Sequence, residues 1–582
     1  MTNDAIVEAL SQAKLLSARQ QEALQRRIQR TGQGIWQALA ELKYCDDAQL
    51  YPVMSQCTGL PLVDAAVAAP PPDATRLLPA RIALQFRCAL LRAESGTAEI
   101  AFSLPPESAR LEQLALLTGC RVRAVLSTPA SLERCLERTY GLGADSMAQL
   151  PGRVTGAATA EGVSDDGSGQ ANSMAARLVD QFIEEACRAG ATDIHFEPYR
   201  RRLQVRFRVD GRLRDIPMPE GIDAMAETIL SRIKVMSQLD IAEKRLPQDG
   251  RLRFRRANGA FCDLRVSTLP TRFGENICLR LLNLDRLCLP MNELGLDEKQ
   301  LRQFRQLLGV PNGLILVTGP TGSGKTTTLY SVLTHLHDKL ADAKIVTVED
   351  PVEYEMPGIT QVQTHAGIGL TFSTALRAIL RHDPDIILVG EIRDRETADI
   401  AVQAALTGHL VFATLHTNDS VGAVSRLVNM GVAPDLVASS LRGVLAQRLV
   451  RRVCPHCAVP DEAPEPAVAA EIAAVVRRNG LLMPTPMTAS PAGCSACGGT
   501  GYAGRVALYE MLVNFPELEA LIERRAPTSA LREAALKGGL QTIRADGWNK
   551  VARGITSVAE VLRVAPSPLA MNDATDNNDQ VP

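Results

Sequence analysis

Residues 313–336 (GLILVTGPTGSGKTTTLYSVLTHL) constrain the fold more than any other stretch of the chain. An apolar run predicts a buried strand, a glycine-rich turn follows, and the next residues are helical in character. This is the structural context that the pattern GxxxxGK[ST] requires. In such a turn the backbone N–H groups face phosphate oxygens, and the amino end of the helix adds a partial positive charge. The stretch therefore predicts a phosphate-binding loop within an α/β sheet.

The residue types of this loop predict ATP and Mg²⁺ as its ligands. We expect Lys325 to reach the β- and γ-phosphates of ATP and Thr326 to ligate Mg²⁺. A glycine-rich turn without a ligand is the alternative, and the Lys-Thr pair between a strand and a helix argues against it. The predicted nucleotide-binding residues are Gly319, Pro320, Thr321, Gly322, Ser323, Gly324, Lys325, Thr326 and Thr327.

Two later predicted strands end in acidic residues. KIVTVEDPVEY (344–354) carries Glu349, Asp350 and Glu353, and DIILVGEIRD (385–394) carries Glu391. Ligands of parallel sheets bind beyond the carboxyl ends of the strands. An ATPase needs carboxylates there to hold Mg²⁺ and to orient the attacking water. We expect Glu391 to be the carboxylate beside Mg²⁺, and either Glu353 or Glu349 to be the base that orients the attacking water. Helix capping or pairing with surface arginines is the alternative, above all for Asp350.

A third strand, HLVFATLHTND (409–419), is bracketed by His409 and His416. Histidine changes its charge or its hydrogen-bond role at little cost, so either residue could sense the phosphate state or a subunit contact. A purely structural role is the alternative for both.

Four of the 13 cysteines form two Cys-x-x-Cys pairs, in VCPHC (453–457) and GCSAC (493–497). Paired knuckles of this kind suit tetrahedral Zn²⁺ with four thiolates, and such a closed site is structural rather than catalytic. Four reduced thiols or a redox pair are the alternatives. We expect the other cysteines to be core or incidental residues. The predicted zinc ligands are Cys454, Cys457, Cys494 and Cys497.

Composition shifts and periodicity divide the chain into several parts. An amphipathic helix near 173–190 opens a region of alternating strands, DIHFEP, LQVRFRVDGRLRDI, RLRFRR and FCDLRVSTL. Strands separated by helices then indicate a parallel α/β sheet. The predicted parts are a helical and mixed module (1–143), a flexible linker (144–172), an α+β domain (173–290), a P-loop domain (291–565) with a tetracysteine subdomain at about 450–510, and a disordered tail (566–582).

The overall charge and hydropathy argue against two classes of protein. The formal net charge is −2, with 63 basic and 65 acidic side chains, whereas proteins that coat nucleic acid usually carry a basic excess. The first residues, MTNDAIVEALSQAK, lack the pattern of a secretory signal, and no apolar run is long enough for a membrane helix. We expect a cytoplasmic protein that associates with a membrane only through partners.

Taken together, these motifs resemble those of the type II secretion system ATPases, within the superfamily of secretion and type IV pilus motors. Four boxes occur in order: GPTGSGKT, the Asp box IVTVEDPVEY, the Walker B-like IILVGEIRD and the His box TGHLVFATLHTN. The resemblance covers about 173–565 strongly and 1–143 weakly. Segments such as GVLAQRLVRRVCPHC are closer to the secretion branch. A pilus extension motor is the first alternative, and a nucleic-acid translocase is a more distant one.

The resemblance implies a RecA-like ATPase domain with a zinc-binding insertion, preceded by a PAS-like α+β domain and a mostly helical module. It also implies a homo-hexameric ring with ATP between the second N-terminal domain and the ATPase domain. Arg265 and Arg280 match the two family arginines that swing onto the phosphates, and Arg206 and Arg208 are weaker candidates for the same region. Arginine suits this role because its fork of donors matches phosphate oxygens.

The implied function is ATP hydrolysis that drives pseudopilus assembly and protein export. Residues 1–143 are expected to dock onto an inner-membrane secretion platform protein, at the cytoplasmic face of that membrane. Some relatives bind a cyclic dinucleotide in this module through Arg-Leu-Gly repeats. The nearest segment here, TGQGIWQALAELKY, lacks that arginine, so we expect no such site.

Overall fold

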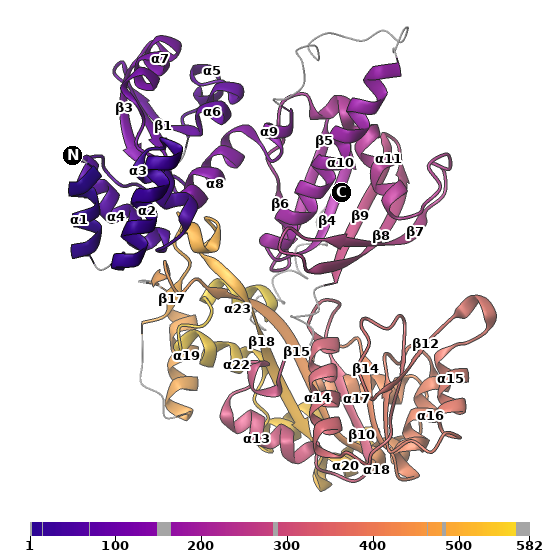
Figure 1. The fold of residues 1–582 in the computed structure, drawn as a ribbon. Helices are drawn as coiled ribbons and strands as arrows, with labels where there is room; N and C mark the ends of the chain where they lie inside the picture. Colours follow the sequence, from indigo (N-terminus) through magenta and orange to yellow (C-terminus); the bar gives the residue numbers. More distant parts are fainter. Residues whose placement is uncertain are drawn as a thin grey trace, which may run out of the picture. The chain divides into compact units, whose positions relative to one another are not determined.

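A computed structural model describes residues 3–13, 15–68, 70–147, 165–282, 289–461, 464–479 and 485–565. The chain divides into two compact units, and each is described by itself. The first consists of residues 1–282 with 491–500, and the second consists of residues 283–490 with 501–582 (Figure 1). Among the described helices, none is both long enough and apolar enough to cross a bilayer.

The first unit begins with four helices around a small apolar core. Two separate helices cover residues 3–31, because Ser17 starts a new one: its backbone N–H donates to the side chain of Gln20, 2.9 Å away. Leu10, Leu24 and Met54 are fully buried between the four helices. The helices are α1 (Asn3–Gln12), α2 (Ala18–Thr31), α3 (Ile35–Leu42) and α4 (Asp47–Thr58).

A three-stranded sheet in the order β1-β2-β3 follows. Strand β2 pairs antiparallel with β1 and parallel with β3. Helix α8 packs on β1, and its N-cap Thr128 accepts a hydrogen bond from the Ser131 N–H. The elements are α5 (Ala74–Leu77), α6 (Ala80–Phe86), β1 (Cys88–Glu94), β2 (Thr97–Phe102), α7 (Ser108–Thr118), β3 (Arg121–Leu126) and α8 (Pro129–Tyr140).

The second part of this unit is a six-stranded antiparallel sheet in the order β6-β5-β4-β9-β8-β7. In β5 every second side chain is buried, because one face of the sheet packs against α10 and α11 while polar residues occupy the other. The elements are α10 (Asp165–Arg188), β4 (Ala191–Pro198), β5 (Leu203–Val209), β6 (Arg212–Asp215), α11 (Ala226–Met236), β7 (Gln248–Arg255), β8 (Phe261–Thr271) and β9 (Gly274–Leu282).

One strand of this sheet differs from the prediction. The run LQVRFRVDGRLRDI is a hairpin of β5 and β6 rather than one strand. Asp210 and Gly211 form its turn with positive φ angles of 49° and 81°. Such Asp-Gly pairs favour two-residue hairpin turns, because both positions need left-handed backbone.

The end of the N-terminal module is packed onto the α+β part. The Leu142 N–H donates to Pro217 O at 2.9 Å, and a Cβ at Gly141 would lie 2.3 Å from the Met218 carbonyl carbon. Helix α9 (Ala144–Met147) follows and contacts α10. Residues 144–147 and 165–172 of the predicted linker are therefore helical, and residues 148–164 lie outside the described ones.

The second unit is built on a seven-stranded sheet in the order β12-β11-β13-β14-β10-β15-β18. Only β18 runs antiparallel to its neighbour, and every residue of β10, β11, β13 and β14 is buried. Apolar clusters cover both faces of the sheet, as in doubly wound α/β folds. The strands are β10 (Gly313–Thr318), β11 (Ile345–Glu349), β12 (Thr360–Gln363), β13 (Ile386–Val389), β14 (Leu410–Leu415), β15 (Leu441–Val453) and β18 (Tyr502–Val513).

Helices connect these strands and complete the domain. The long hairpin of β15 and β18 carries the insertion with the four cysteines, which includes the short strands β16 (Val459–Pro460) and β17 (Met487–Thr488). Trp548 is 1 % exposed and packs with the insertion helix α19. The helices are α13 (Glu298–Leu307), α14 (Lys325–Lys339), α15 (Phe372–Ile379), α16 (Arg395–Leu406), α17 (Ser420–Asn429), α18 (Pro434–Ser440), α19 (Pro466–Arg478), α20 (Pro516–Glu523), α21 (Thr528–Lys537), α22 (Ile543–Ala552) and α23 (Val558–Val564).

Candidate active site

The predicted phosphate loop lies between the carboxyl end of β10 and the amino end of α14. Gly319, Gly322 and Gly324 have φ angles of 150°, 76° and 89°, which residues with a Cβ rarely adopt. A Cβ at Gly319 would lie 2.5 Å from Gln447 O, whereas nothing lies within 4 Å of one at Gly322. The backbone at Gly322 is thus accessible to a ligand, and Ser323 Oγ is buried without a hydrogen-bond partner among the described residues.

The side chain of Lys325 folds back toward this loop, and its ammonium group contacts two backbone carbonyls there. Its Nζ donates to Gly319 O at 2.9 Å and to Pro320 O at 3.2 Å. Burial lowers the pKa of Lys325, the Glu391 carboxylate opposes that shift, and Arg448 adds to it. Lys325 and Glu391 are therefore near enough to interact electrostatically, while Thr326 and Thr327 follow in the first turn of α14.

Gln447 on the neighbouring strand β15 is hydrogen-bonded to the phosphate loop. The sequence motif alone did not predict this contact. The Gln447 Nε2 donates to Ser323 O at 2.7 Å, and its Oε1 accepts from Thr328 Oγ1 at 3.0 Å. The side chain is 1 % exposed. Because β15 lies beside β10, Gln447 joins the neighbouring strand to both the loop and the helix.

The two candidate bases of the Asp box occupy different environments. Glu349 is the last residue of β11 and is 4 % exposed, with its carboxylate bonded to buried polar side chains. Glu353 follows in the loop, is half-buried, and donates its backbone N–H to Tyr330 Oη at 3.3 Å. Asp350 is exposed and lies 3.9 Å from Arg393 Nη1. The carboxylate of Glu349 is thus engaged in internal hydrogen bonds, whereas Glu353 is partly accessible.

Glu391 and His416 come together at the carboxyl edge of the sheet. Glu391 follows β13, His416 follows the adjacent β14, and His416 Nε2 lies 3.5 Å from Glu391 Oε2. Arg393 also donates to Glu391. The sheet thus brings Lys325, Glu391 and His416 to one edge.

His409 does not join this group. It precedes β14 and therefore lies at the opposite edge of the parallel sheet from His416. Its Nδ1 lies 2.9 Å from Ala404 O and 3.3 Å from Thr407 Oγ1, at the end of α16. The structure places His409 in a local turn, away from the phosphate loop.

Arg265 and Arg280 lie in the α+β domain of the first unit. They are cross-strand partners on β8 and β9, so they share a face of the sheet. Arg251 on β7 is opposite Arg265, and Asp193 on β4 is opposite Arg280. Arg208 pairs with Asp193 from the other side, whereas Arg206 is bound to Glu197 at 2.7 Å. A row of arginines interrupted by one aspartate therefore crosses this sheet.

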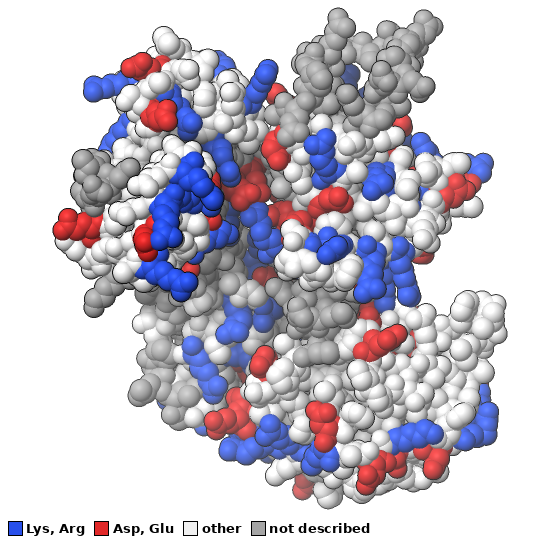
Figure 2. All heavy atoms as spheres, viewed as in Figure 1, with Lys and Arg blue, Asp and Glu red and all other residues white. Residues whose placement is uncertain are grey.

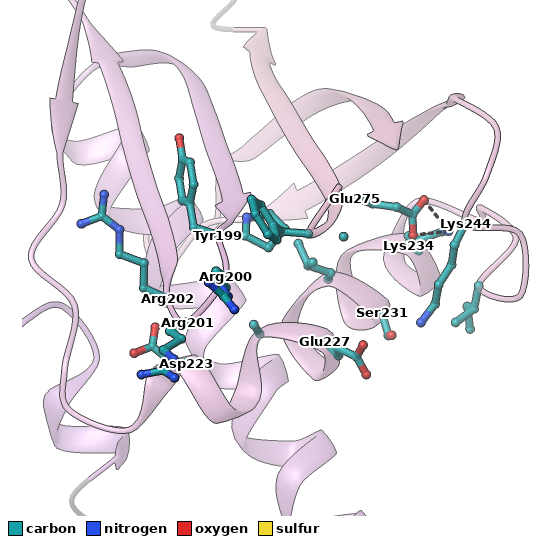
Figure 3. Close-up of a pocket in the computed structure, with 16 residues that line it drawn as sticks. Tyr199, Arg200, Arg201, Arg202, Asp223, Glu227, Ser231, Lys234, Lys244 and Glu275 are labelled. Carbon is teal, nitrogen blue, oxygen red and sulfur yellow. Dashed lines mark hydrogen bonds and ion pairs between the residues drawn. The ribbon is translucent and has the colours of Figure 1, made fainter. Parts of the chain in front are cut away.

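The same domain contains a cavity of about 240 Å³ (Figure 3). Its lining includes three exposed large apolar side chains, Tyr199, Ile241 and Phe273. Basic residues lie among them, and at one side Lys234, 1 % exposed, is bonded to Glu275 at 3.0 Å. The lining thus combines exposed apolar side chains with charged residues of both signs.

The four paired cysteines lie together, as their spacing predicted. One sulfur from each residue lies within 4.8 Å of the others. Zn–S bonds of about 2.3 Å in a tetrahedron require sulfurs about 3.8 Å apart, and Cys494 and Cys497 are separated by 3.8 Å. The donor set and its spacing fit Zn²⁺.

Comparison with known families gives two matches. Residues 169–563 match the family described as type II/IV secretion system protein, which is more than half of the chain. Residues 58–146 match the MshEN domain.

Three curated relatives illustrate the range of similarity. The type IV pilus assembly ATPase PilB of Myxococcus xanthus is 38 % identical over 561 residues, which cover 95 % of this chain and 98 % of the relative. The type II secretion system protein E of Xanthomonas campestris pv. campestris is 38 % identical over 575 residues, or 96 % and 98 %. The type II secretion system protein HxcR of Pseudomonas aeruginosa is 50 % identical over 388 residues, or 67 % and 76 %.

Proposed function

Because the chain belongs to the type II/IV secretion system family and is an ATPase, we propose that it is a cytoplasmic motor for pseudopilus assembly and protein export by a type II secretion system. The observation that carries this proposal is the meeting of Lys325, Glu391 and His416 at one edge of the sheet. The higher identity to HxcR favours secretion over pilus extension, which remains the second candidate because of the full-length similarity to PilB.

In this proposal each site residue has a separate role in ATP hydrolysis. Lys325 holds the β- and γ-phosphates, and the N–H groups of the loop bind the same oxygens. Thr326 and Glu391 would hold Mg²⁺, and the bound ion would supply positive charge to neutralise the phosphates. Glu353 orients the attacking water and accepts its proton. His416 lies against Glu391 and responds to the charge on that side of the site.

Arg265 and Arg280 couple the phosphate state to the position of the α+β domain. Both guanidinium groups bind the γ-phosphate when the two domains close over ATP. Hydrolysis removes the group that they hold, so the closed arrangement loses its preferential stabilisation and the domains reopen. This cycle converts hydrolysis into movement.

A homo-hexameric ring is the proposed working form. The cavity in the α+β domain supports it, because Tyr199, Ile241 and Phe273 are exposed apolar side chains that line it. Clustered exposed apolar side chains commonly mark protein interaction sites. The neighbouring copy of the chain is the proposed occupant.

The N-terminal module is proposed to dock onto a membrane platform protein at the cytoplasmic face of the inner membrane. Basic side chains gather over α2 (Figure 2), and Arg19, Arg26 and Arg30 are exposed there. Such a face complements an acidic partner surface. Zn²⁺ on the four cysteines is proposed to be structural, since four thiolates leave no open coordination position.

The test is capture of the full-length protein by purified cytoplasmic domains of the two kinds of platform. We expect the domain of a secretion platform protein to bind and the doubly reversed variant Arg26→Glu, Arg30→Glu to bind less. Binding only to a pilus platform domain would support the second candidate, and binding to neither would contradict the docking proposal.

A further inference from the structure

Tyr330 connects the phosphate-loop helix to the Asp box. It lies in the second turn of α14 and is fully buried. Its hydroxyl donates to Glu349 Oε2, and Tyr330 Oη in turn accepts a hydrogen bond from the backbone N–H of Glu353 at 3.3 Å. One phenol thus contacts the carboxylate of Glu349 and the backbone of Glu353, the two residues that the sequence offers as candidate bases.

Glu349 is held in place by side chains from three elements. Thr347 Oγ1 donates to its Oε1 at 2.6 Å, Gln361 Nε2 on β12 donates to the same oxygen at 3.3 Å, and Tyr330 occupies the other oxygen. A buried carboxylate with this many donors is stabilised as an anchor. Both of its oxygens already accept hydrogen bonds from side chains of the protein.

The segment after Glu349 is fixed at further points. The rings of Tyr330 and Tyr354 pack edge to face, with centroids 4.7 Å apart. Gln361 donates to Tyr354 O at 3.1 Å and accepts from the Met356 N–H at 2.7 Å. Contacts before and after Glu353 therefore set the path of the backbone that carries it.

From these contacts we propose that Tyr330 and Glu349 are positioning residues for ATP hydrolysis, which fix the Glu353 segment relative to the helix that begins with Lys325. Lys325 and Tyr330 share α14, so a shift of the phosphate end of the helix moves the phenol that contacts Glu353. This inference rests on the proposed function, with Glu353 as the base. It reassigns Glu349 from base to anchor.

The test is the variant Tyr330→Phe in the full-length protein. Phenylalanine keeps the ring contact with Tyr354 and removes only the oxygen that contacts Glu349 and Glu353. We expect kcat for ATP hydrolysis to fall about tenfold or more, because small misplacements of a catalytic group are costly. KM and the affinity for a non-hydrolysable ATP analogue should change less than about twofold, since Lys325 and the loop are untouched.

Tyr51→Phe is the matched control. It removes the same phenol oxygen from an equally buried tyrosine of the N-terminal module, where Tyr51 Oη donates to Ser103 O at 2.7 Å. We expect it to lower thermal stability while kcat stays within about twofold of the parent. A loss of kcat equal to that of Tyr330→Phe would show that the loss reflects folding rather than positioning and would overturn the inference.

A third variant separates this inference from the proposed function. Glu353→Ala should be inactive if Glu353 is the base. Near-parental kcat in Tyr330→Phe, together with inactive Glu353→Ala, overturns the positioning role and leaves the function intact. Full activity of Glu353→Ala overturns the assignment of the base and the positioning inference with it.

Discussion

Arg265 on β8 lies directly opposite Arg280 on β9, and Arg280 Nε is 3.0 Å from Asp193 Oδ1. Two like charges on facing positions of a sheet normally destabilise it. Asp193 is 5 % exposed and holds the side chain of Arg280, which is itself 61 % exposed. Arg280, held by a buried carboxylate, remains largely exposed beside a second arginine, which suits this position to bind an anion such as a phosphate.

Replacing either arginine should slow hydrolysis. For Arg265→Gln and Arg280→Gln we expect kcat to fall at least about tenfold, because transition-state charge on the γ-phosphate loses a fork of donors. Steady-state phosphate release measures the effect. Arg253→Gln, an exposed arginine of β7 that pairs with Asp263, is the control and should remain near the parent. Parental rates in both pair variants would contradict the assignment.

Gln447→Leu should weaken nucleotide binding and destabilise the protein. Ser323 O and Thr328 lose their partner, and an unsatisfied buried polar group costs about 1–3 kcal/mol. We expect ATP affinity to fall about tenfold as the loop loosens, as measured by calorimetry.

Asn514→Leu is the comparison for Gln447→Leu. Asn514 lies near the other end of the β15–β18 hairpin and donates to Ala438 O and Leu441 O, each at 3.0 Å. It should lower stability while leaving ATP affinity unchanged. If both variants lost affinity equally, Gln447 would have no specific role at the loop.

The cysteine cluster should hold one zinc ion per chain, detectable by elemental analysis of the purified protein. Cys454→Ser should lose the metal and destabilise the second unit by about 3 kcal/mol or more, since the folded insertion depends on it. Cys45→Ser, a half-buried cysteine outside the cluster, should retain the zinc. Zinc in both variants, or in neither, would contradict the assignment.

The contact between the N-terminal module and the α+β part should depend on pH. Burial raises the pKa of Glu137 to about 7 from 4.5, although Arg188, 3.0 Å away, opposes the shift. The folded state therefore binds more protons than the unfolded chain between these values. The contribution of Glu137 to the free energy of unfolding is therefore complete below about pH 4.5, and it is lost as the pH rises through about 7.

Glu137→Gln should flatten this dependence, because an amide does not titrate. The measurement is the urea midpoint of the full-length protein at several values between pH 5 and 8. Glu112→Gln, an exposed acid on α7, should leave the slope unchanged. An equal slope in the parent and in Glu137→Gln would show that Glu137 does not control the contact.

Local patterns predicted the parts of the site that are contiguous in sequence. The phosphate loop and the cysteine pairs have fixed spacing, and the chemistry of a phosphate or of a tetrahedral metal requires that spacing, so Lys325 and the four cysteines lie where the pattern indicated. The carboxyl ends of adjacent parallel strands meet, which is why Glu391 and His416 could be expected together.

Other features depend on tertiary packing. Gln447 lies over a hundred residues from the loop that it holds, and only the pairing of β10 with β15 brings them together. The burial of Glu349 follows from Tyr330 and Gln361, which no motif connects to it. The position of His409 could have been inferred, since a residue before a parallel strand lies at the edge opposite its carboxyl end.

Titration calorimetry of the magnesium-loaded full-length protein with ATP tests the central claim most directly. The account predicts saturable binding at one site per chain, and it predicts that Lys325→Ala remains folded by circular dichroism but loses hydrolysis and most of this binding. Absence of ATP binding in the well-folded parent, or near-normal turnover in Lys325→Ala, would contradict it.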